Sequence, residues 1–271
     1  MPTVEWETAP ATLRFIEEVE RGEAMRLDVV AMAIAAHAYP GLDIDEQLVA
    51  LDRIARHPDL HRTGVDATAL AEHLFSGERF LGNTAGYDDP RNSYLNDVLA
   101  RHLGIPITLV LVMMEVGRRI GVPVLGIGMP GHFLARDARD PDLFFDPFTG
   151  AAPLDGAGCR ARFRSVAGAG ALWHPSFLAP VGPGEIITRM LTNLQQGAVA
   201  RRSAEGVWSA RLRLLVPGLP GPERRRSANV LGGFGRYTEA ARALDALAAT
   251  LPADEATVVT TEADGWRARA N

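Results

Sequence analysis

The spacing of apolar residues predicts a layer of amphipathic helices in the first third of the chain. Four stretches between residues 12 and 80 carry apolar side chains at helical intervals, and turn residues separate them. In the third stretch, Leu48, Leu51 and Ile54 form one apolar stripe, while the charged residues lie off it. The predicted helices cover residues 12–21, 27–39, 45–57 and 66–75.

The pattern changes between residues 81 and 150, where apolar density is highest. Residues 107–116 are nearly all apolar, too many for an ordinary strand and too few to cross a membrane, so they predict a helix buried on most sides. Pro106 suits the first turn of that helix. Short stretches rich in branched or aromatic residues predict strands at 122–129, 132–136 and 142–146.

The last two predicted strands form a hairpin that places a histidine opposite an aspartate. With the loop centred on Arg139, His132 faces Asp146. The same register pairs Arg136 with Asp142 and Leu134 with Phe144. A carboxylate beside a histidine can fix its tautomer and stabilise the imidazolium, as in a nucleophile triad. The alternative is a structural, partly buried His132, with Asp146 capping the following turn.

Composition removes several classes of function. The 33 acidic and 28 basic residues give a net charge of −5, so no positive field draws in nucleic acid or anionic lipid. Lysine is absent, which excludes a Schiff-base lysine and a P-loop lysine. Cys159 is the only cysteine, and the histidines form no ligand motif such as HExxH. We therefore expect neither a disulfide, a metal nor a cofactor.

The chain carries no recognisable targeting or membrane segment. Its first residues lack a basic region followed by an apolar one, and no stretch reaches the roughly 18 apolar residues of a membrane span. We expect a cytoplasmic protein whose partners are proteins, peptides or small molecules. The sequence leaves the oligomeric state open.

Composition also suggests a boundary in the second half. Residues 151–184 are rich in Gly, Ala and Pro, as in a linker, and helical patterns alternate with turns beyond them. We expect one domain over residues 1–165 and a helical region over 184–271. The last predicted helix, which ends before Pro252, resembles the second helix of a tetratricopeptide unit.

Two groups of motifs follow one another in the central segment. They are YDDP at 87–90, NSYL at 92–95 and GIPI at 104–107, then PGHFL at 130–134 and DPF at 146–148. In this order they resemble the SirB-type transglutaminase-like family of bacteria. MLTNL at 190–194 and the tetratricopeptide-like end extend the resemblance over nearly the whole chain.

The resemblance implies an α+β fold with a transglutaminase-like (papain-like) core. In that core a buried helix, which carries a cysteine in its first turn in active relatives, packs on antiparallel strands bearing the histidine and then the aspartate. Here the helix begins near Pro106, and no cysteine lies near it. Its nearest hydroxyl is that of Thr108, and Ser93 is a second candidate. Either residue could instead cap a helix.

The missing cysteine leaves two functions open. The first is a degenerate transglutaminase-like protein that binds a protein or peptide in the former active-site cleft without turning it over. The second is an amide hydrolase or acyltransferase that uses Thr108, Ser93 or Cys159 with the His132/Asp146 pair. Cys159 follows both members of that pair, and neighbouring arginines could make it a reactive thiol.

Overall fold

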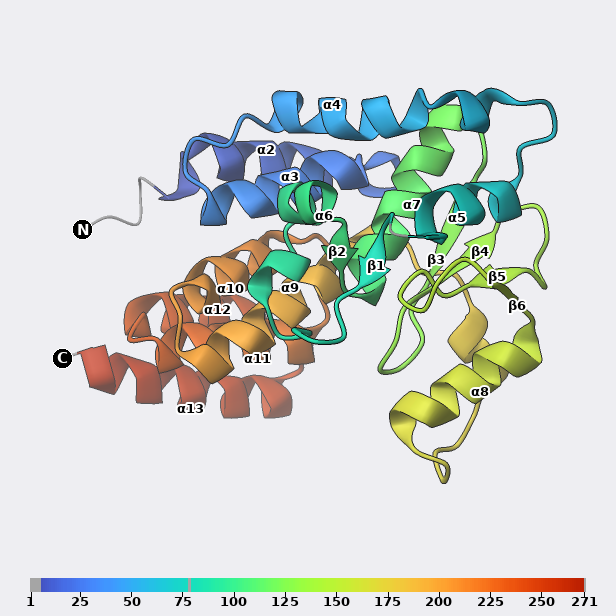
Figure 1. The fold of residues 1–271 in the computed structure, drawn as a ribbon. Helices are drawn as coiled ribbons and strands as arrows, with labels where there is room; N and C mark the ends of the chain where they lie inside the picture. The colour runs from blue at the N-terminus through green and yellow to red at the C-terminus, as the bar shows by residue number, and fades with distance from the viewer. Residues whose placement is uncertain (1–5, 78, 271) are drawn as a thin grey trace. The chain divides into compact units, whose positions relative to one another are not determined.

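The N-terminal part of the protein consists of helices, as predicted. We describe the protein from a computed structural model that covers residues 6–77 and 79–270. The first helices are α2 (Pro10–Val19), α3 (Leu27–Ala38), α4 (Ile44–Ala55) and α5 (Ala67–Phe75) (Figure 1). Local signals explain two of the starts, because Asp43 accepts a hydrogen bond from the Glu46 amide at 3.1 Å and Asp66 accepts one from the Ala69 amide at 2.9 Å.

The predicted buried helix is α7 (Pro106–Ile120), which follows the short α6 (Leu95–Arg101). Its residues from Leu109 to Met113 are fully buried. Pro106 occupies its first turn, and Gly121 ends it in the left-handed conformation with φ of 74°. Helix α7 packs against strands of the larger sheet and against α3, α4 and α5. It is therefore the centre of the core.

Two small sheets accompany this helix. β1 (Leu81–Gly82) and β2 (Leu103–Gly104) form a parallel pair. The second sheet is antiparallel, with the order β3 (Val124–Ile127), β4 (Leu134–Asp137), β5 (Phe144–Phe145) and β6 (Pro153–Leu154). Strands β3 and β4 both contact α7. A buried helix on antiparallel strands confirms the predicted α+β class.

The register of the β4–β5 hairpin differs from the prediction by two residues. Arg136 pairs with Phe144 and Ala135 with Phe145, so the predicted pairs of Arg136 with Asp142 and Leu134 with Phe144 are wrong. The turn takes up Asp142, whose amide donates to the Asp140 carboxylate at 3.0 Å. A shift of two residues keeps every side chain on its own face of the sheet.

Two helices were not predicted. They are α8 (Gly156–Ala167), which lies in the segment expected to resemble a linker, and α13 (Ala253–Ala270), which follows Pro252. Helix α8 is capped by Asp155, which accepts a hydrogen bond from the Gly158 amide at 2.8 Å, and buries Cys159 and Phe163 on one face. The prediction missed this helix because the segment is rich in Gly and Ala and has only two strongly apolar positions, Cys159 and Phe163, on its buried face. The linker-like residues 168–182 follow α8.

The C-terminal part is an array of helices, as predicted. It comprises α9 (Pro183–Arg201), α10 (Glu205–Leu215), α11 (Gly221–Gly233), α12 (Tyr237–Ala248) and α13. From α10 to α13, each helix packs against the next. Alanines and leucines of α11 and α12 share a core with Val259 and Ala263 of α13.

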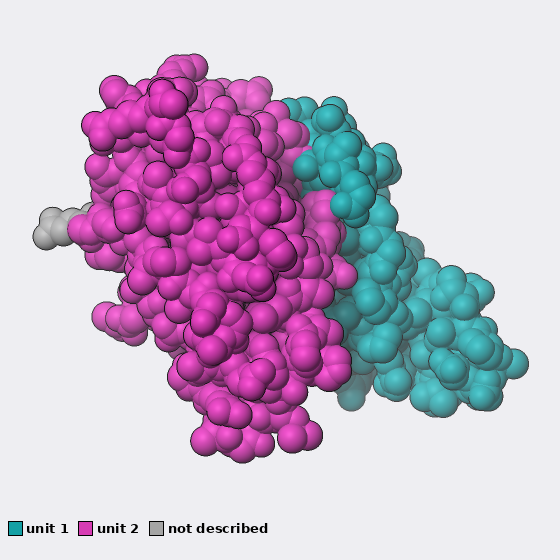
Figure 2. Space-filling view, turned by 90° about the vertical axis from the view of Figure 1, so that its right-hand side faces the viewer, with its two compact units in different colours: residues 1–25, 187–271 teal, residues 26–186 magenta. Residues whose placement is uncertain are grey.

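The chain divides into two compact units, coloured separately in Figure 2. One contains residues 26–186, and the other contains residues 1–25 together with 187–271. The prediction placed the first 25 residues in the N-terminal domain. They group with the C-terminal helices because α2 packs on α10, and the Arg211 guanidinium lies 5.0 Å from the centre of the Trp6 ring.

A buried group of charges joins α3 to α7. The Asp28 carboxylate is fully buried and receives hydrogen bonds from Arg26 at 2.8 and 3.0 Å and from Arg119 at 2.6 Å. Arg119 also binds Asp52 at 2.7 Å and Glu115 at 2.9 Å. Burial alone would raise the pKa of Asp28, but the hydrogen bonds from the two arginines lower it to about 2.

Among the described residues, no helix combines the length and the hydropathy of a membrane span.

Candidate functional site

His132 lies in the turn that precedes β4. Gly131, with φ of 75°, makes the turn, and the His132 amide donates to the Met129 carbonyl at 3.1 Å. The imidazole Nε2 lies 2.9 Å from Oδ1 of Asp146, and both side chains are buried, at 7% and 2% exposed. The predicted contact is therefore present. The two residues meet diagonally across the hairpin, because the shift in register was even.

The hydrogen bond fixes which nitrogen of His132 carries a proton when the ring is neutral. A carboxylate accepts, so Nε2 is the donor and Nδ1 is the basic nitrogen. Oδ1 of Asp146 also accepts from the Phe148 amide at 3.2 Å, which holds the carboxylate in place. This is the arrangement of a base and its orienting group.

A third side chain, Arg162 of helix α8, also contacts Asp146. Its Nε lies 2.7 Å from Oδ2 of Asp146, and its Nη2 donates to the Thr149 hydroxyl at 3.1 Å. Asp146 thus lies between an imidazole and a guanidinium, which compensates its buried negative charge. No spacing in the sequence indicates this contact, and α8 itself was not predicted.

Aromatic rings border the pair. The Phe148 ring meets His132 edge to face at 6.2 Å and Tyr87 at 5.8 Å. The backbone of Phe148 approaches β1 so closely that a Cβ on Gly82 would lie 2.3 Å from the Phe148 carbonyl oxygen. Gly82 pairs with Gly104, two residues before α7 begins. The aromatic border therefore links the His132 hairpin to the start of α7.

The Thr108 hydroxyl is engaged in capping the start of α7. It donates to the Asn92 carbonyl at 2.8 Å or the Ile105 carbonyl at 3.1 Å, and accepts from the Ile105 amide at 3.1 Å. The side chain is fully buried. Its single proton is therefore directed at backbone carbonyls, and the capping alternative describes its geometry.

Ser93 follows Asn92, whose carbonyl is the acceptor for Thr108. Its amide donates to the Pro90 carbonyl at 2.9 Å at the end of a short 3₁₀ turn, and the residue is 6% exposed. The N-cap residue of α6 is Tyr94, so the hypothesis that Ser93 caps this helix is wrong. The hydrogen bond from Thr108 to Asn92 thus places the segment that contains Ser93 beside the first turn of α7.

Cys159 is packed in the apolar core between helix α8 and the four-stranded sheet. It is fully buried in a cluster with Ile127, Leu134, Phe144 and Phe163. Burial, with the nearby carboxylates of Asp155 and Asp146, raises the pKa of its thiol to about 12. Neighbouring arginines are not among the groups that shift this pKa, and a buried thiol with a raised pKa has the properties of a structural cysteine.

Comparison with known proteins identifies the family to which the chain belongs. A profile described as the Transglutaminase-like superfamily matches residues 15–192. The chain belongs to the transglutaminase-like superfamily. The matched residues include His132, Asp146, Thr108, Ser93 and Cys159, and thus every candidate discussed above.

Several curated proteins resemble this superfamily member in sequence. A UPF0162 protein of Xylella fastidiosa (strain Temecula1) is 35% identical over 181 residues, which are 64% of this chain and 64% of that protein. A UPF0162 protein of Pseudomonas aeruginosa is 32% identical over 173 residues, 61% of this chain and 62% of that protein. The chain thus spans less than two thirds of the length of each of these relatives.

A shorter similarity joins the chain to a eukaryotic protein. F-box only protein 21 of Mus musculus is 40% identical over 63 residues, which are 23% of this chain and 10% of that protein. No solved structure matches the chain.

The residues with the geometry of metal ligands lie elsewhere in this transglutaminase-like chain. Within residues 6–77 and 79–270, one nitrogen or oxygen each from His57, Asp59 and His73 come within 4.8 Å of one another. The prediction of no metal site rested on the absence of ligand motifs in the sequence. His57, Asp59 and His73 form no such motif, so that argument did not consider them. Its members meet only because α5 packs beside the short 3₁₀ helix Pro58–His61.

Proposed function

We propose that this chain is a degenerate transglutaminase-like protein that binds a protein or peptide at the surface around His132 without turning it over. The observation that carries the proposal is the state of the candidate nucleophiles. The start of α7, where active relatives are expected to carry a cysteine, holds Thr108 with its hydroxyl bonded to backbone, and Cys159 is buried on another helix.

The chemistry of Thr108 supports binding over turnover. A base activates a nucleophile by accepting its proton, so the two must share a hydrogen bond in the reactive state. The Thr108 proton instead points at the Asn92 or the Ile105 carbonyl, and transferring it to His132 would break that hydrogen bond. Losing such a hydrogen bond costs about 1 kcal/mol. A threonine hydroxyl also lacks the acidity that the field of a helix start gives to a thiol.

The surroundings of His132 suit contact with a polypeptide. Tyr87 is 48% exposed, and its ring continues through Phe148 to the imidazole of His132. Tyrosine offers a large, rigid contact area together with a hydroxyl that can bond to a peptide backbone. Arg162, 30% exposed, adds a cation at the edge of the same group.

Finer assignments belong to the same proposal. The motifs between residues 87 and 148 support a SirB-type relationship, and the successive packing of α10 to α13 supports a tetratricopeptide-like region over residues 184–271. The net charge of −5 supports protein partners rather than nucleic acid. We also propose a cytoplasmic location, because the protein's single cysteine is a buried free thiol and its core contains no disulfide.

Selection from a random peptide library on the immobilised protein tests the binding function. We expect selected peptides to bind the wild-type protein in fluorescence polarisation and to lose at least about tenfold in affinity with Tyr87→Ala. Leu172→Ala is the control, because Leu172 is 90% exposed in the same compact unit. Mass spectrometry should recover each peptide intact. Cleaved peptides, or peptides equally sensitive to both variants, would contradict the proposal.

Acyl transfer is the second candidate, and the retained His132–Asp146 pair favours it. An imidazole with its Nε2 held by a carboxylate is arranged as a base toward whatever lies at Nδ1. In this case Thr108 or Ser93 would form the covalent intermediate. The signature is an adduct with an ester or amide probe on one of these two hydroxyls.

A further inference from the structure

Two imidazoles and a carboxylate converge on the side of the protein formed by α5 and the 3₁₀ helix Pro58–His61. His57 precedes that short helix, Asp59 lies within it, and His73 projects from α5. Nδ1 of His57 lies 3.6 Å from Oδ2 of Asp59, and the rings of His57 and His73 are 4.5 Å apart at 51°. Two histidines and one aspartate are the ligands that bind late first-row divalent metals.

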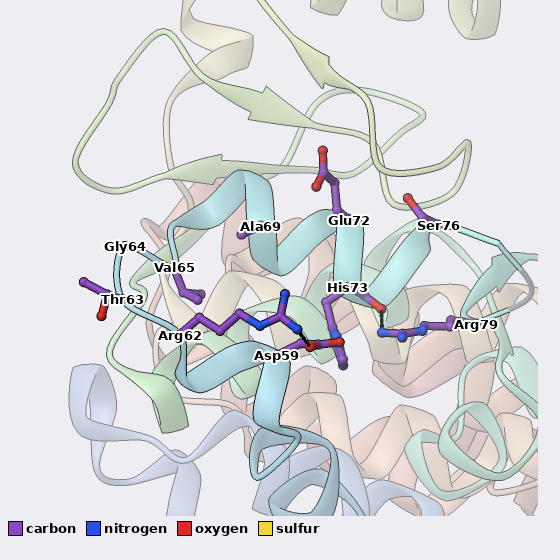
Figure 3. A pocket seen from close by; sticks show the side chains of 10 residues that line it. All are labelled: Asp59, Arg62, Thr63, Gly64, Val65, Ala69, Glu72, His73, Ser76 and Arg79. Atoms are coloured by element: carbon purple, nitrogen blue, oxygen red, sulfur yellow. Dashed lines mark hydrogen bonds and ion pairs between the residues drawn. The ribbon is translucent and has the colours of Figure 1, made fainter.

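The group is open to solvent through two cavities. Asp59 and His73 line a cavity of about 450 Å³ with Arg62, Glu72 and Arg79, and Figure 3 shows Asp59, Arg62 and Arg79 beside His73. His73 also lines a second cavity of about 340 Å³, together with His57 and apolar side chains such as Leu74 and Phe80. An ion between these side chains would therefore have access from bulk water and room for a further ligand.

We propose that His57, Asp59 and His73 form a binding site for a late first-row divalent cation, tested here as Zn²⁺. The three side chains supply three ligands, and a water molecule in the cavity beside Asp59 completes a four-coordinate site. Three protein ligands with one open position is the arrangement that catalytic zinc sites use. The proposal does not depend on the function of His132.

The distances require only small movements. Bonds of about 2.0–2.1 Å to a tetrahedral ion place neighbouring ligand atoms about 3.4 Å apart. The 3.6 Å between His57 and Asp59 is already near this value, and the widest separation in the group is within 4.8 Å. A shift of about one or two ångströms in the His73 ring would bring the third ligand to this spacing. Nδ1 of His57 accepts a hydrogen bond from the Asp59 amide at 3.3 Å, so an ion bound at this nitrogen would replace that hydrogen bond.

Neighbouring charges define which oxygen of Asp59 is used. Arg62 pairs with Oδ1 of Asp59 at 2.5 Å, as the dashed line in Figure 3 shows, and leaves Oδ2 facing His57. Arg79 donates to the His73 carbonyl rather than to its ring. The arginines therefore orient the ligands without occupying the ligand atoms.

Metal titration of the full chain, purified without a histidine tag, tests the proposal. We expect one Zn²⁺ per chain by calorimetry, and a Co²⁺ complex with the strong visible absorption of a four-coordinate site. His57→Ala, His73→Ala and Asp59→Asn should each weaken Zn²⁺ binding by at least about 100-fold, since losing a supporting residue alone costs 10- to 100-fold.

The control is His61→Ala, which removes an imidazole from the same short helix but leaves the three ligands in place. It should retain wild-type Zn²⁺ affinity. The metal-free wild type provides a second readout that needs no variant, because Zn²⁺ should raise its melting temperature. No stoichiometric Zn²⁺, or equal loss of affinity in His61→Ala and His73→Ala, would overturn the proposal.

Discussion

At the scale of single residues, the burial of Cys159 predicts a poorly reactive thiol. We expect a maleimide to label the native protein only slightly at pH 8, because the thiol is fully buried and its pKa of about 12 leaves little thiolate. The same reagent should label one equivalent in urea. Since this is the only cysteine, mass spectrometry identifies the labelled site directly. Rapid stoichiometric labelling of the folded protein would contradict the buried placement.

The His132–Asp146 contact could be predicted from the sequence because only the parity of the hairpin register mattered. The register was wrong by two residues, yet both side chains stayed on one face and still met. Arg162 could not be predicted, since its contact depends on a helix packed beside the sheet. The hydrogen bond from Thr108 to the Asn92 carbonyl likewise depends on a loop distant in sequence.

The Asp28 group predicts a large, pH-dependent effect on stability. Asp28→Asn should lower the free energy of unfolding by about 3 kcal/mol at pH 7, because it leaves the largely buried Arg119 guanidinium without this carboxylate. The folded pKa of about 2 lies below the ordinary value near 3.9, so this stabilisation is complete above about pH 4 and disappears as the pH falls toward 2.

Urea unfolding at pH 7 and pH 3 measures the Asp28 effect. The difference between wild type and Asp28→Asn should shrink at the lower pH. Asp45→Asn is the control, because Asp45 is exposed in the first turn of α4 and should change stability by at most about 1 kcal/mol. A constant difference at both pH values would show that the Asp28 carboxylate is not ionised in this group.

At the scale of elements, helices with a clear apolar stripe could be predicted and the others could not. Helices α2 to α5 and α7 follow from spacing and caps. Helix α8 was hidden by glycines and alanines, and α13 carries few apolar residues at helical intervals. The parallel β1–β2 pair has two residues in each strand, too few for a sequence period.

Gly117 of α7 is a position where we expect replacement by alanine to destabilise the protein, contrary to helix propensity. Replacing a helix glycine with alanine usually stabilises by up to about 1 kcal/mol. A Cβ on Gly117, however, would lie 2.4 Å from the Val122 carbonyl oxygen and 3.1 Å from Leu70. We expect Gly117→Ala to destabilise by about 1–3 kcal/mol through overpacking.

Helix α13 offers the matched substitution. A Cβ on Gly265 would meet nothing within 4 Å, so Gly265→Ala should raise stability by about 0.5–1 kcal/mol. Calorimetric unfolding of both variants against wild type checks the opposite signs. A stabilised Gly117→Ala would show that the α7–β3 connection has more room than the structure indicates.

At the scale of the whole molecule, composition suggested a domain boundary but did not show which segments belong to each compact unit. The first 25 residues join the C-terminal helices through contacts of α2 with α10, which no local pattern encodes. The group of His57, Asp59 and His73 also arises from tertiary packing rather than from a motif. The order of the motifs suggested a transglutaminase-like protein, and the profile match over residues 15–192 confirmed that superfamily.

The absence of an activated nucleophile is best tested by labelling the purified protein with reactive ester, amide and thiol probes. Wild type is compared with His132→Ala and Cys159→Ala, and adducts are mapped by mass spectrometry. We expect no adduct that depends on His132. A covalent adduct on Thr108 or Ser93 that vanishes with His132→Ala would contradict the noncatalytic function and establish an enzyme.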